Sequence, residues 1–262
     1  MYMRVVLTGA AGGIGRRVAR RLVEQGHTVV GLDRRAVALD GVETHVLDLT
    51  DGEAVRELLA GQPVDALVTA AGWYEVSAIE ECSPETFRRH LESNLVAVHT
   101  VVHAVLPTLR RRQGRVVVVG SSTGSVALPF HGAYSTAKAG LHGYTDSLRR
   151  EVEPRGVDVT LVEPGPTRTG LNESAVRGAD GDGAYAEAHE RFQGYSPQSI
   201  TPEQVAASVL TAATADSPRV RYRVGGRARW LPRLAAVVPT RLFDRIVRAG
   251  LPGGLLGRLV DR

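Results

Sequence analysis

The stretch "VLTGAAGGIGRRVARRL", residues 6–22, joins an apolar run to an amphipathic helical pattern through three spaced glycines, Gly9, Gly13 and Gly15. Glycine allows a tight turn and a close approach to a ligand, and the first turn of a helix offers free N–H groups to phosphate. The spacing G-x-x-x-G-x-G therefore predicts a strand, a turn and a helix that bind a pyrophosphate. A tight turn without a ligand is the alternative that this motif alone leaves open.

The alternation of short apolar runs with helix-length amphipathic segments continues along the chain. Predicted strands are residues 4–8, 28–33, 43–49, 65–71, 115–120, 158–165 and 219–226. Predicted helices are residues 14–25, 53–60, 84–112 with one break, 132–151, and one that starts at a capping box formed by Thr201 and Gln204. Near-continuous apolar strands are typical of parallel sheets. We therefore predict an α/β fold, a single-domain Rossmann-type doubly wound parallel sheet of about seven strands with helices on both faces.

The composition is typical of a soluble globular protein, with 43% hydrophobic and 23% charged residues among 262. A single cysteine, Cys82, excludes an intrachain disulfide and favours a reducing compartment. The N-terminus becomes glycine-rich before an apolar signal segment forms, so we predict a cytoplasmic protein. The net charge of +4 arises from Gly226 onward, where eight arginines face two aspartates. The main body therefore has no basic excess, and we predict no nucleic-acid partner.

Asp33 ends the second predicted strand, about 20 residues after Gly13, where a carboxylate reaches the ribose hydroxyls of an adenosine. A carboxylate accepts hydrogen bonds from a free 2′-OH and repels a 2′-phosphate, so Asp33 favours NAD over NADP. The neighbouring Arg16, Arg34 and Arg35 would soften this preference. An ordinary turn residue at a strand end is the alternative for Asp33 alone.

Asp48 follows the third predicted strand and precedes Leu49. Its carboxylate could accept a hydrogen bond from the adenine amino group. Alternatively, it could cap the helix that starts near Asp51.

The segment "HGAYSTAKAGLHGY", residues 131–144, contains the only lysine of the chain. Tyr134 and Lys138 are one helical turn apart, so their side chains share a face. An ammonium beside a phenol favours the phenolate and lowers its pKa from about 10. Such a phenol can exchange a proton with an alcohol or a carbonyl, and a compact ammonium suits ribose hydroxyls better than a planar guanidinium does. A surface helix with an exposed lysine is the alternative.

The motifs occur in one order, and together they resemble those of short-chain dehydrogenases/reductases over about residues 3–225. They are the glycine turn, Asp33, "ESNL" (92–95), "GSSTG" (120–124), "YSTAK" (134–138) and "EPGPTRT" (163–169). The resemblance implies an NAD(P)-dependent oxidoreductase that interconverts a secondary alcohol and a ketone, with NAD as the favoured cofactor and NADP as an alternative. It also implies a homodimer or homotetramer. The alternatives are an NADPH-dependent ketoreductase of a biosynthetic pathway and a non-catalytic dinucleotide-binding regulator.

By the same resemblance, Tyr134 is the general acid/base and Ser121, with Ser122 as its rival, orients the substrate oxygen. Lys138 would bind the nicotinamide ribose and lower the pKa of Tyr134, and Asn94 would hold a water that relays protons. The implied cofactor-binding residues are Gly9, Gly13, Ile14, Gly15, Asp33, Asp48, Leu49, Ala71, Gly72, Tyr134, Lys138, Pro164, Gly165, Thr167 and Thr169.

The segment directly after the fourth predicted strand departs from the pattern of the family. The family often has Asn-Asn-Ala-Gly there, whereas this chain has Thr69-Ala70-Ala71-Gly72. The asparagine that would brace the backbone at position 70 is missing. We expect a local change of stability and no loss of activity.

Residues 170–200 are long and rich in Gly and Asp, and we predict a substrate-binding loop there. An apolar acceptor site is predicted from this loop and from the residues after the catalytic serine. The side chains concerned are Val126, Ala127, Leu128, Pro129, Phe130, Leu171, Tyr185, Phe192 and Tyr195, and Trp73 and Tyr74 either line the same cleft or pack.

Residues 226–262 form a predicted basic amphipathic extension. Leu242, Phe243, Ile246 and Val247 recur with helical spacing, with arginines beside them. We favour packing of this apolar stripe on the body of this subunit or of a neighbouring subunit, beside the substrate cleft, over contact with an anionic membrane.

His99 and His103 are spaced like a pair of metal ligands on a helix, but the sequence suggests no third ligand. We predict no metal site.

Overall fold

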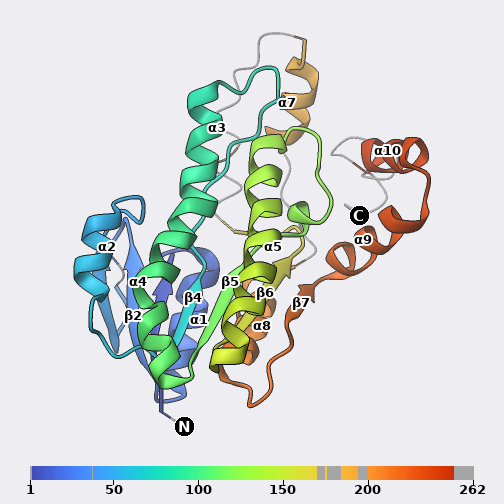
Figure 1. Ribbon diagram of the computed structural model, residues 1–262. Coiled ribbons are helices and arrows are strands. Elements are labelled where there is room, and N and C mark those ends of the chain that lie inside the picture. Colours follow the sequence, from blue (N-terminus) through green and yellow to red (C-terminus); the bar gives the residue numbers. More distant parts are fainter. Residues whose placement is uncertain (1, 37, 170–174, 176–183, 194–199, 251–262) are drawn as a thin grey trace.

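The computed structural model describes residues 2–36, 38–169, 175, 184–193 and 200–250. Seven parallel strands form one sheet in the order β3-β2-β1-β4-β5-β6-β7 (Figure 1). The strands are β1 (Arg4–Thr8), β2 (Thr28–Asp33), β3 (Val42–Val46), β4 (Ala66–Thr69), β5 (Arg115–Val119), β6 (Asp158–Pro164) and β7 (Arg221–Val224). The predicted doubly wound parallel sheet is confirmed, although most strands are shorter than predicted.

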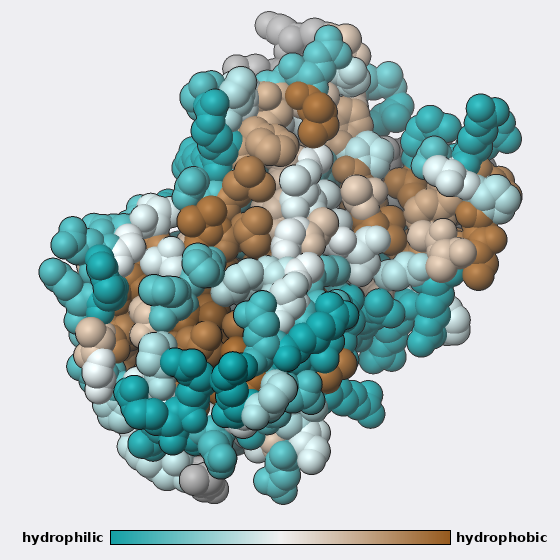
Figure 2. All heavy atoms as spheres, viewed as in Figure 1, coloured by the Kyte–Doolittle hydropathy of each residue, from teal (hydrophilic) through white to brown (hydrophobic). Residues whose placement is uncertain are grey.

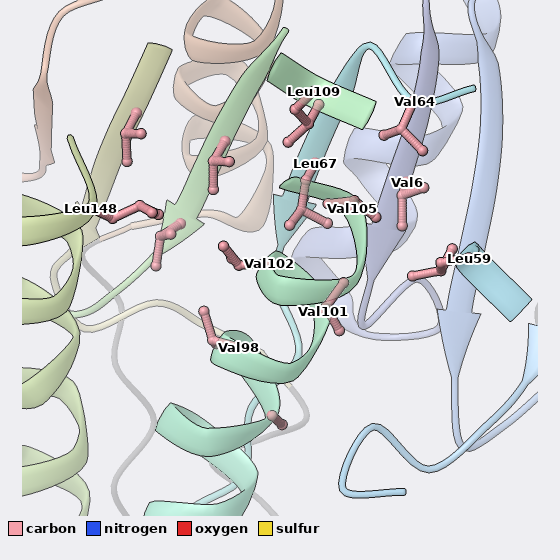
Figure 3. Close-up of a cluster of buried hydrophobic side chains, with 14 of the residues drawn as sticks. Val6, Leu59, Val64, Leu67, Val98, Val101, Val102, Val105, Leu109 and Leu148 are labelled. Atoms are coloured by element: carbon pink, nitrogen blue, oxygen red, sulfur yellow. The ribbon is translucent and has the colours of Figure 1, made fainter. Parts of the chain in front are cut away.

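Helices cover both faces of the sheet, as predicted. The described helices are α1 (Gly13–Glu24), α2 (Gly52–Leu59), α3 (Pro84–Leu91), α4 (Ala97–Arg112), α5 (Gly132–Val152), α7 (Ala186–Gln193), α8 (Pro202–Thr214), α9 (Gly226–Val237) and α10 (Thr240–Ala249). One apolar core joins α1 and α8 to the sheet, and a second joins α2, α4 and α5 to its other face. Figure 3 shows the second core, where Val98, Val102 and Val105 of α4 lie opposite Val6 and Leu67 of the strands.

The order of the strands places a crevice at one edge of the sheet. From β1 the chain builds β2 and β3 on one side, then crosses back to build β4 to β7 on the other. The connections that leave β1 and β4 therefore diverge, and doubly wound sheets bind ligands at the carboxyl ends of such a strand pair. The glycine turn between β1 and α1 lies at this point.

The glycine turn is tight because its backbone packs against neighbouring backbone. Gly9 has a φ of 72°, and a Cβ added there would lie 2.6 Å from the backbone nitrogen of Ala71. A Cβ on Gly15 would overlap the carbonyl oxygen of Gly9. Any larger residue at either position would push the turn out of place.

The predicted break within residues 84–112 is a π-helical turn, Glu92–Val96, that connects α3 to α4 without interruption. Such a turn widens the helix by one residue and is frequent at functional sites. The predicted capping box at the start of α8 is confirmed, because Thr201 and Gln204 exchange hydrogen bonds between their side chains and backbones.

Between β7 and Gly250, where the described part of the chain ends, there are two helices, α9 and α10, separated at Pro239. They stand beside the body of the protein at the right of Figure 1. Within the described part of the chain, no helix combines the length and the apolar character that crossing a bilayer requires.

Candidate functional site

A cavity of about 940 Å³ runs along the carboxyl ends of the strands, where the topology predicts a binding site. It is lined by every residue that the sequence assigned to the cofactor or to catalysis, except Asn94. The residues brought together are Gly9, Gly13, Ile14, Gly15, Asp33, Asp48, Leu49, Ala71, Gly72, Ser121, Tyr134, Lys138, Pro164, Gly165, Thr167 and Thr169.

Asp33 projects from the end of β2 into this cavity, with 12% of its side chain exposed. One carboxylate oxygen accepts a hydrogen bond from the backbone N–H of Ala11 in the glycine turn, at 2.9 Å. The other accepts from the backbone N–H of Arg35 at 3.0 Å. The carboxylate is therefore fixed beside the glycine turn and presents negative charge to the cavity.

Asp48 does not cap the following helix, because Asp51 does so through hydrogen bonds from the backbone N–H groups of Glu53 and Ala54. The carboxylate of Asp48 instead accepts from Thr50 and forms an ion pair of 2.9 Å with Arg34. Burial tends to raise the pKa of Asp48, but the hydrogen bonds from Thr50 and Arg34 together hold it below its ordinary value.

The glycine turn and the acidic side chains form a cradle suited to a dinucleotide. Gly9 and Gly15 leave no room for a Cβ, and a Cβ on Gly13 would lie 3.3 Å from the Thr169 side chain. A phosphate can therefore approach the backbone N–H groups at the start of α1. The fixed carboxylate of Asp33 then lies where ribose hydroxyls need an acceptor.

Tyr134 and Ser121 meet at the other part of the cavity. Tyr134 lies in the first turn of α5, and Ser121 ends the loop after β5. The two side chains are hydrogen-bonded, which tends to lower the pKa of Tyr134, but burial outweighs this effect and raises that pKa to about 12. Ser121 also accepts hydrogen bonds from Thr123. Ser121 thus faces the phenol, while Ser122, which also lines the cavity, begins a short 3₁₀ turn.

Lys138 is almost fully buried, with 3% of its surface exposed. Its Nζ donates a hydrogen bond of 3.4 Å to the carbonyl oxygen of Val119 and lies 5.6 Å from the centre of the Tyr134 ring. Burial lowers the pKa of Lys138 to about 8. The predicted lowering of the Tyr134 pKa by Lys138 is not seen, because burial dominates the phenol and its one other influence is Ser121.

Asn94 lies in the π-helical turn and is fully buried. Its Nδ2 donates to the carbonyl oxygens of Trp73, at 2.6 Å, and His90, at 3.0 Å, and its Oδ1 accepts from the N–H of Trp73 at 3.2 Å. A Cβ on Gly72 would lie 3.1 Å from Asn94 Oδ1 and 3.7 Å from Lys138 Nζ. Asn94 therefore lies behind the cavity. It binds the backbone of Trp73, next to Gly72, which is the residue that Lys138 also approaches.

The chain as a whole is similar to known proteins. The chain matches the family "short chain dehydrogenase" over residues 3–180. It is 35% identical over 226 residues to "Dehydrogenase/reductase SDR family member 7B" of Bos taurus, covering 78% of this chain and 69% of that protein. The chain belongs to the short-chain dehydrogenase/reductase family. Members of this family are oxidoreductases that use a nicotinamide dinucleotide.

Solved structures agree with this assignment. A short-chain dehydrogenase from Streptomyces avermitilis has a TM-score of 0.77 and 30% sequence identity, covering 95% of this chain and 98% of that chain. One from Burkholderia cenocepacia, in complex with NADP, has a TM-score of 0.79 and 23% identity, covering 94% and 97%. The second likeness establishes the fold alone, and its NADP is a property of that protein.

In this short-chain dehydrogenase, Thr8 braces the backbone of the segment that follows β4. The backbone N–H of Ala70 donates to the Thr8 carbonyl at 3.2 Å, and that of Ala71 donates to the Thr8 hydroxyl at 3.3 Å. The Thr69 hydroxyl is buried without a hydrogen-bond partner in the described structure. The close approach of Gly9 to this segment is therefore held mainly by backbone hydrogen bonds.

The cavity beyond Tyr134 is lined mainly by apolar and aromatic side chains, among them Tyr74, Val126, Leu128, His131 and Phe192. The Tyr74 ring lies 4.9 Å from that of Tyr134, centre to centre. Phe130 packs behind, against Phe192 and Tyr185. Trp73 also lines the cavity, whereas Leu171 and Tyr195 lie outside the described residues.

Several lining residues were not assigned to the site from the sequence. Among them are Ser93, Arg227 and Leu231 of α9, Ile246 and Val247 of α10, and Gly250 directly after α10. The helical spacing of Ile246 and Val247 marked an apolar stripe, but no local signal says that this stripe lies over the cavity. Figure 2 shows hydrophobic and hydrophilic side chains next to one another over α9 and α10.

Glu163 forms a buried ionic centre near the segments that carry Tyr134 and Ser121. It is fully buried in β6, and its carboxylate is paired with Arg221 at 2.7 Å and Arg223 at 2.9 Å, both from β7. The His142 ring, two turns after Tyr134 in α5, lies 3.5 Å from the same carboxylate and is hydrogen-bonded to the backbone of Ser121. Burial lowers the pKa of His142. Glu163 therefore links the β6–β7 edge to the helix and loop that carry Tyr134 and Ser121.

The pair His99 and His103 packs ring to ring, with centres 5.8 Å apart. Nδ1 of His99 lies 3.3 Å from the Tyr144 hydroxyl. Among the described residues, no group of three His, Cys, Asp or Glu side chains has the arrangement of a metal site.

Proposed function

We propose that this protein interconverts a secondary alcohol and a ketone on a hydrophobic small molecule, with NAD(H) preferred over NADP(H). The observation that carries the proposal is the meeting of Tyr134, Ser121 and Lys138 in the cavity that also holds the glycine turn and Asp33. A proton-transfer group and a dinucleotide cradle in one cavity are the two requirements of alcohol–ketone chemistry with a nicotinamide.

The side chains have separable tasks in this proposal. When bound, the nicotinamide supplies or accepts the hydride. Ser121 holds the substrate oxygen, and Tyr134 gives a proton to a carbonyl or takes one from an alcohol. Because burial raises the pKa of Tyr134 to about 12, the phenol is protonated at neutral pH and ready to act as the acid in ketone reduction. Alcohol oxidation needs the phenolate, so it becomes easier as the pH rises.

Lys138 and Asn94 support the phenol in this mechanism. Lys138, with a pKa of about 8, is mainly charged at neutral pH and can hold ribose hydroxyls. Asn94 fixes the backbone at Trp73 from behind the cavity, and Gly72 lies between its Oδ1 and the Lys138 ammonium. A water bound in this region would connect the Lys138 ammonium to solvent.

The preference for NAD(H) rests on Asp33. Its carboxylate is fixed by two backbone N–H groups and faces the cavity, where it would accept hydrogen bonds from a 2′-OH and repel a 2′-phosphate. Arg34 is paired with Asp48, which offsets its charge. The second candidate function is NADPH-dependent ketone reduction, and Arg35 supports it. Its side chain is 73% exposed and lies 3.8 Å from Asp33 at the cavity, where it would meet a 2′-phosphate.

The Tyr134→Phe substitution tests the proposal. It removes only the transferable proton, so kcat should fall about 10²- to 10⁴-fold while NADH binding, followed by nicotinamide fluorescence, stays unchanged. Tyr144→Phe is the matched control, because Tyr144 is a second tyrosine of α5 whose pKa burial also raises to about 12, and it lies outside the cavity lining. Retention of more than about 1% of kcat by Tyr134→Phe would exclude Tyr134 as the acid/base.

A further inference from the structure

The two C-terminal helices contribute to the same cavity as the catalytic residues. Leu231 of α9 and Ile246 and Val247 of α10 line it together with Tyr134. The region matched to the family ends at residue 180, well before these helices. The cavity wall that they form therefore lies outside the segment matched to the family model, although the Streptomyces avermitilis structure covers 95% of the chain.

The two faces of α10 differ in character. Phe243, Ile246 and Val247 recur on one side and are half-buried, and the last two line the cavity. Arg241, Arg245 and Arg248 recur on the other side and are exposed. Leu242, on the border between the two, is 50% exposed and does not line the cavity. The orientation of α10 thus follows its sequence pattern, with the apolar side turned to the cavity.

The opposite wall of the substrate region is also apolar. Val126 and Leu128 follow the catalytic loop, and Phe192 comes from α7. Apart from Arg227 at the start of α9, the ionised side chains described in the cavity lining are Asp33, Arg34, Arg35, Asp48 and Lys138. Those five belong to the cofactor cradle and the catalytic group. The space between the apolar walls therefore suits a chain without charge.

We propose that α10 is the outer wall of the substrate site, and that the substrate is a secondary alcohol or ketone whose extended apolar chain runs from Tyr134 toward Ile246 and Val247. The inference rests on the proposed function and specifies the substrate class of that site. The half-buried faces of Ile246 and Val247 become covered when such a chain binds. Each methylene that the chain places against this wall should raise kcat/KM by up to about fourfold.

The test is a chain-length series of 2-alkanols, from 2-butanol to 2-decanol, oxidised with NAD by the full-length enzyme and by single variants. For the wild type, kcat/KM should rise with chain length. Ile246→Ser should lower kcat/KM about tenfold or more for 2-decanol and less than about twofold for 2-butanol. Leu242→Ser is the matched control on the same helix, and it should leave both values within about twofold of wild type.

A second variant separates the loss of a wall from a general loosening of α10. Val247→Trp fills the cavity, so it should shorten the chain length at which kcat/KM is highest. Equal effects of Leu242→Ser and Ile246→Ser would overturn the proposal, as would a wild-type enzyme that oxidises 2-butanol and 2-decanol equally well. Absence of turnover with every alkanol and every corresponding ketone, with NADH binding intact, would overturn the proposed function as well.

Discussion

The buried lysine to which we assign a role in catalysis should destabilise the fold that contains it. Lys138 is 3% exposed, and its one described hydrogen bond, to the carbonyl oxygen of Val119, is long at 3.4 Å. Burial holds its pKa at about 8, below the ordinary value of 10.5, so the buried ammonium is less stable than the same group in the unfolded chain. That difference in pKa corresponds to about 3 kcal/mol of unfolding free energy. Lys138→Met keeps a long apolar stem and removes the charge.

We therefore expect Lys138→Met to be inactive yet more stable than the wild type at pH 7, by about 2–3 kcal/mol, or about 4–12 °C in apparent Tm. The sign follows from the protons bound. Between pH 8 and 10.5 the folded wild type holds fewer protons at Lys138 than the unfolded chain does, so its stability rises with pH in this range. The loss of unfolding free energy caused by the buried ammonium is complete below pH 8 and disappears toward pH 10.5. The advantage of the Met variant should disappear with it.

Thermal unfolding by circular dichroism at pH 7, 8, 9 and 10 measures this difference. Lys138→Arg is the control, because it retains a buried cation and should show no gain at pH 7. It also tests whether a guanidinium can replace the ammonium in catalysis, where we expect failure. The reasoning is refuted if Lys138→Met is less stable than the wild type at pH 7, or if its advantage is the same at every pH.

Two further outcomes follow from the described contacts. Asp33→Ala should relax the proposed preference for NAD(H), because Arg34 and Arg35 would then meet a 2′-phosphate without an opposing carboxylate. Values of kcat/KM with NADH and with NADPH measure this preference. A wild-type enzyme that favours NADPH would contradict the role assigned to Asp33. Glu163→Gln should lower the free energy of unfolding by about 2–3 kcal/mol, since it leaves the partly buried Arg223 without its described counter-charge and Arg221 with only Asp146, at 3.5 Å. Glu43→Gln is the control and should lower the free energy of unfolding by at most about 1 kcal/mol, because Glu43 pairs with Arg4 at a similar distance of 2.8 Å but is 45% exposed. If thermal unfolding shows equal losses of stability for the two variants, burial does not have the role assigned to it.

Most of the fold could be predicted because it depends on patterns that lie close together in the sequence. The apolar runs and the glycine turn identified seven strands and the doubly wound sheet, and the motif order identified the residues that meet in the cavity. The carboxyl ends of parallel strands lie at one edge of the sheet, so residues placed there by sequence converge without any further information. Asn94 is the exception, because its side chain points into a backbone network behind the cavity.

The features that the sequence did not reveal depend on contacts between distant segments. The pairing of Glu163 with Arg221 and Arg223 requires β6 and β7 to be neighbours in a particular register. The effect of burial on the pKa of Tyr134 was not predicted, because spacing shows the nearby lysine but not the depth of burial.

By itself, the sequence determined that this chain forms a parallel α/β sheet with a nucleotide cradle and a tyrosine and lysine on one helical face, since each of these is encoded by local periodicity or short spacing. Only the tertiary structure decided that α10 turns its apolar stripe toward the cavity. An amphipathic stripe specifies that a helix needs an apolar partner, but hydrophobic burial has no direction. The choice among body, neighbouring subunit and membrane is therefore made by the position in which the rest of the fold holds the helix.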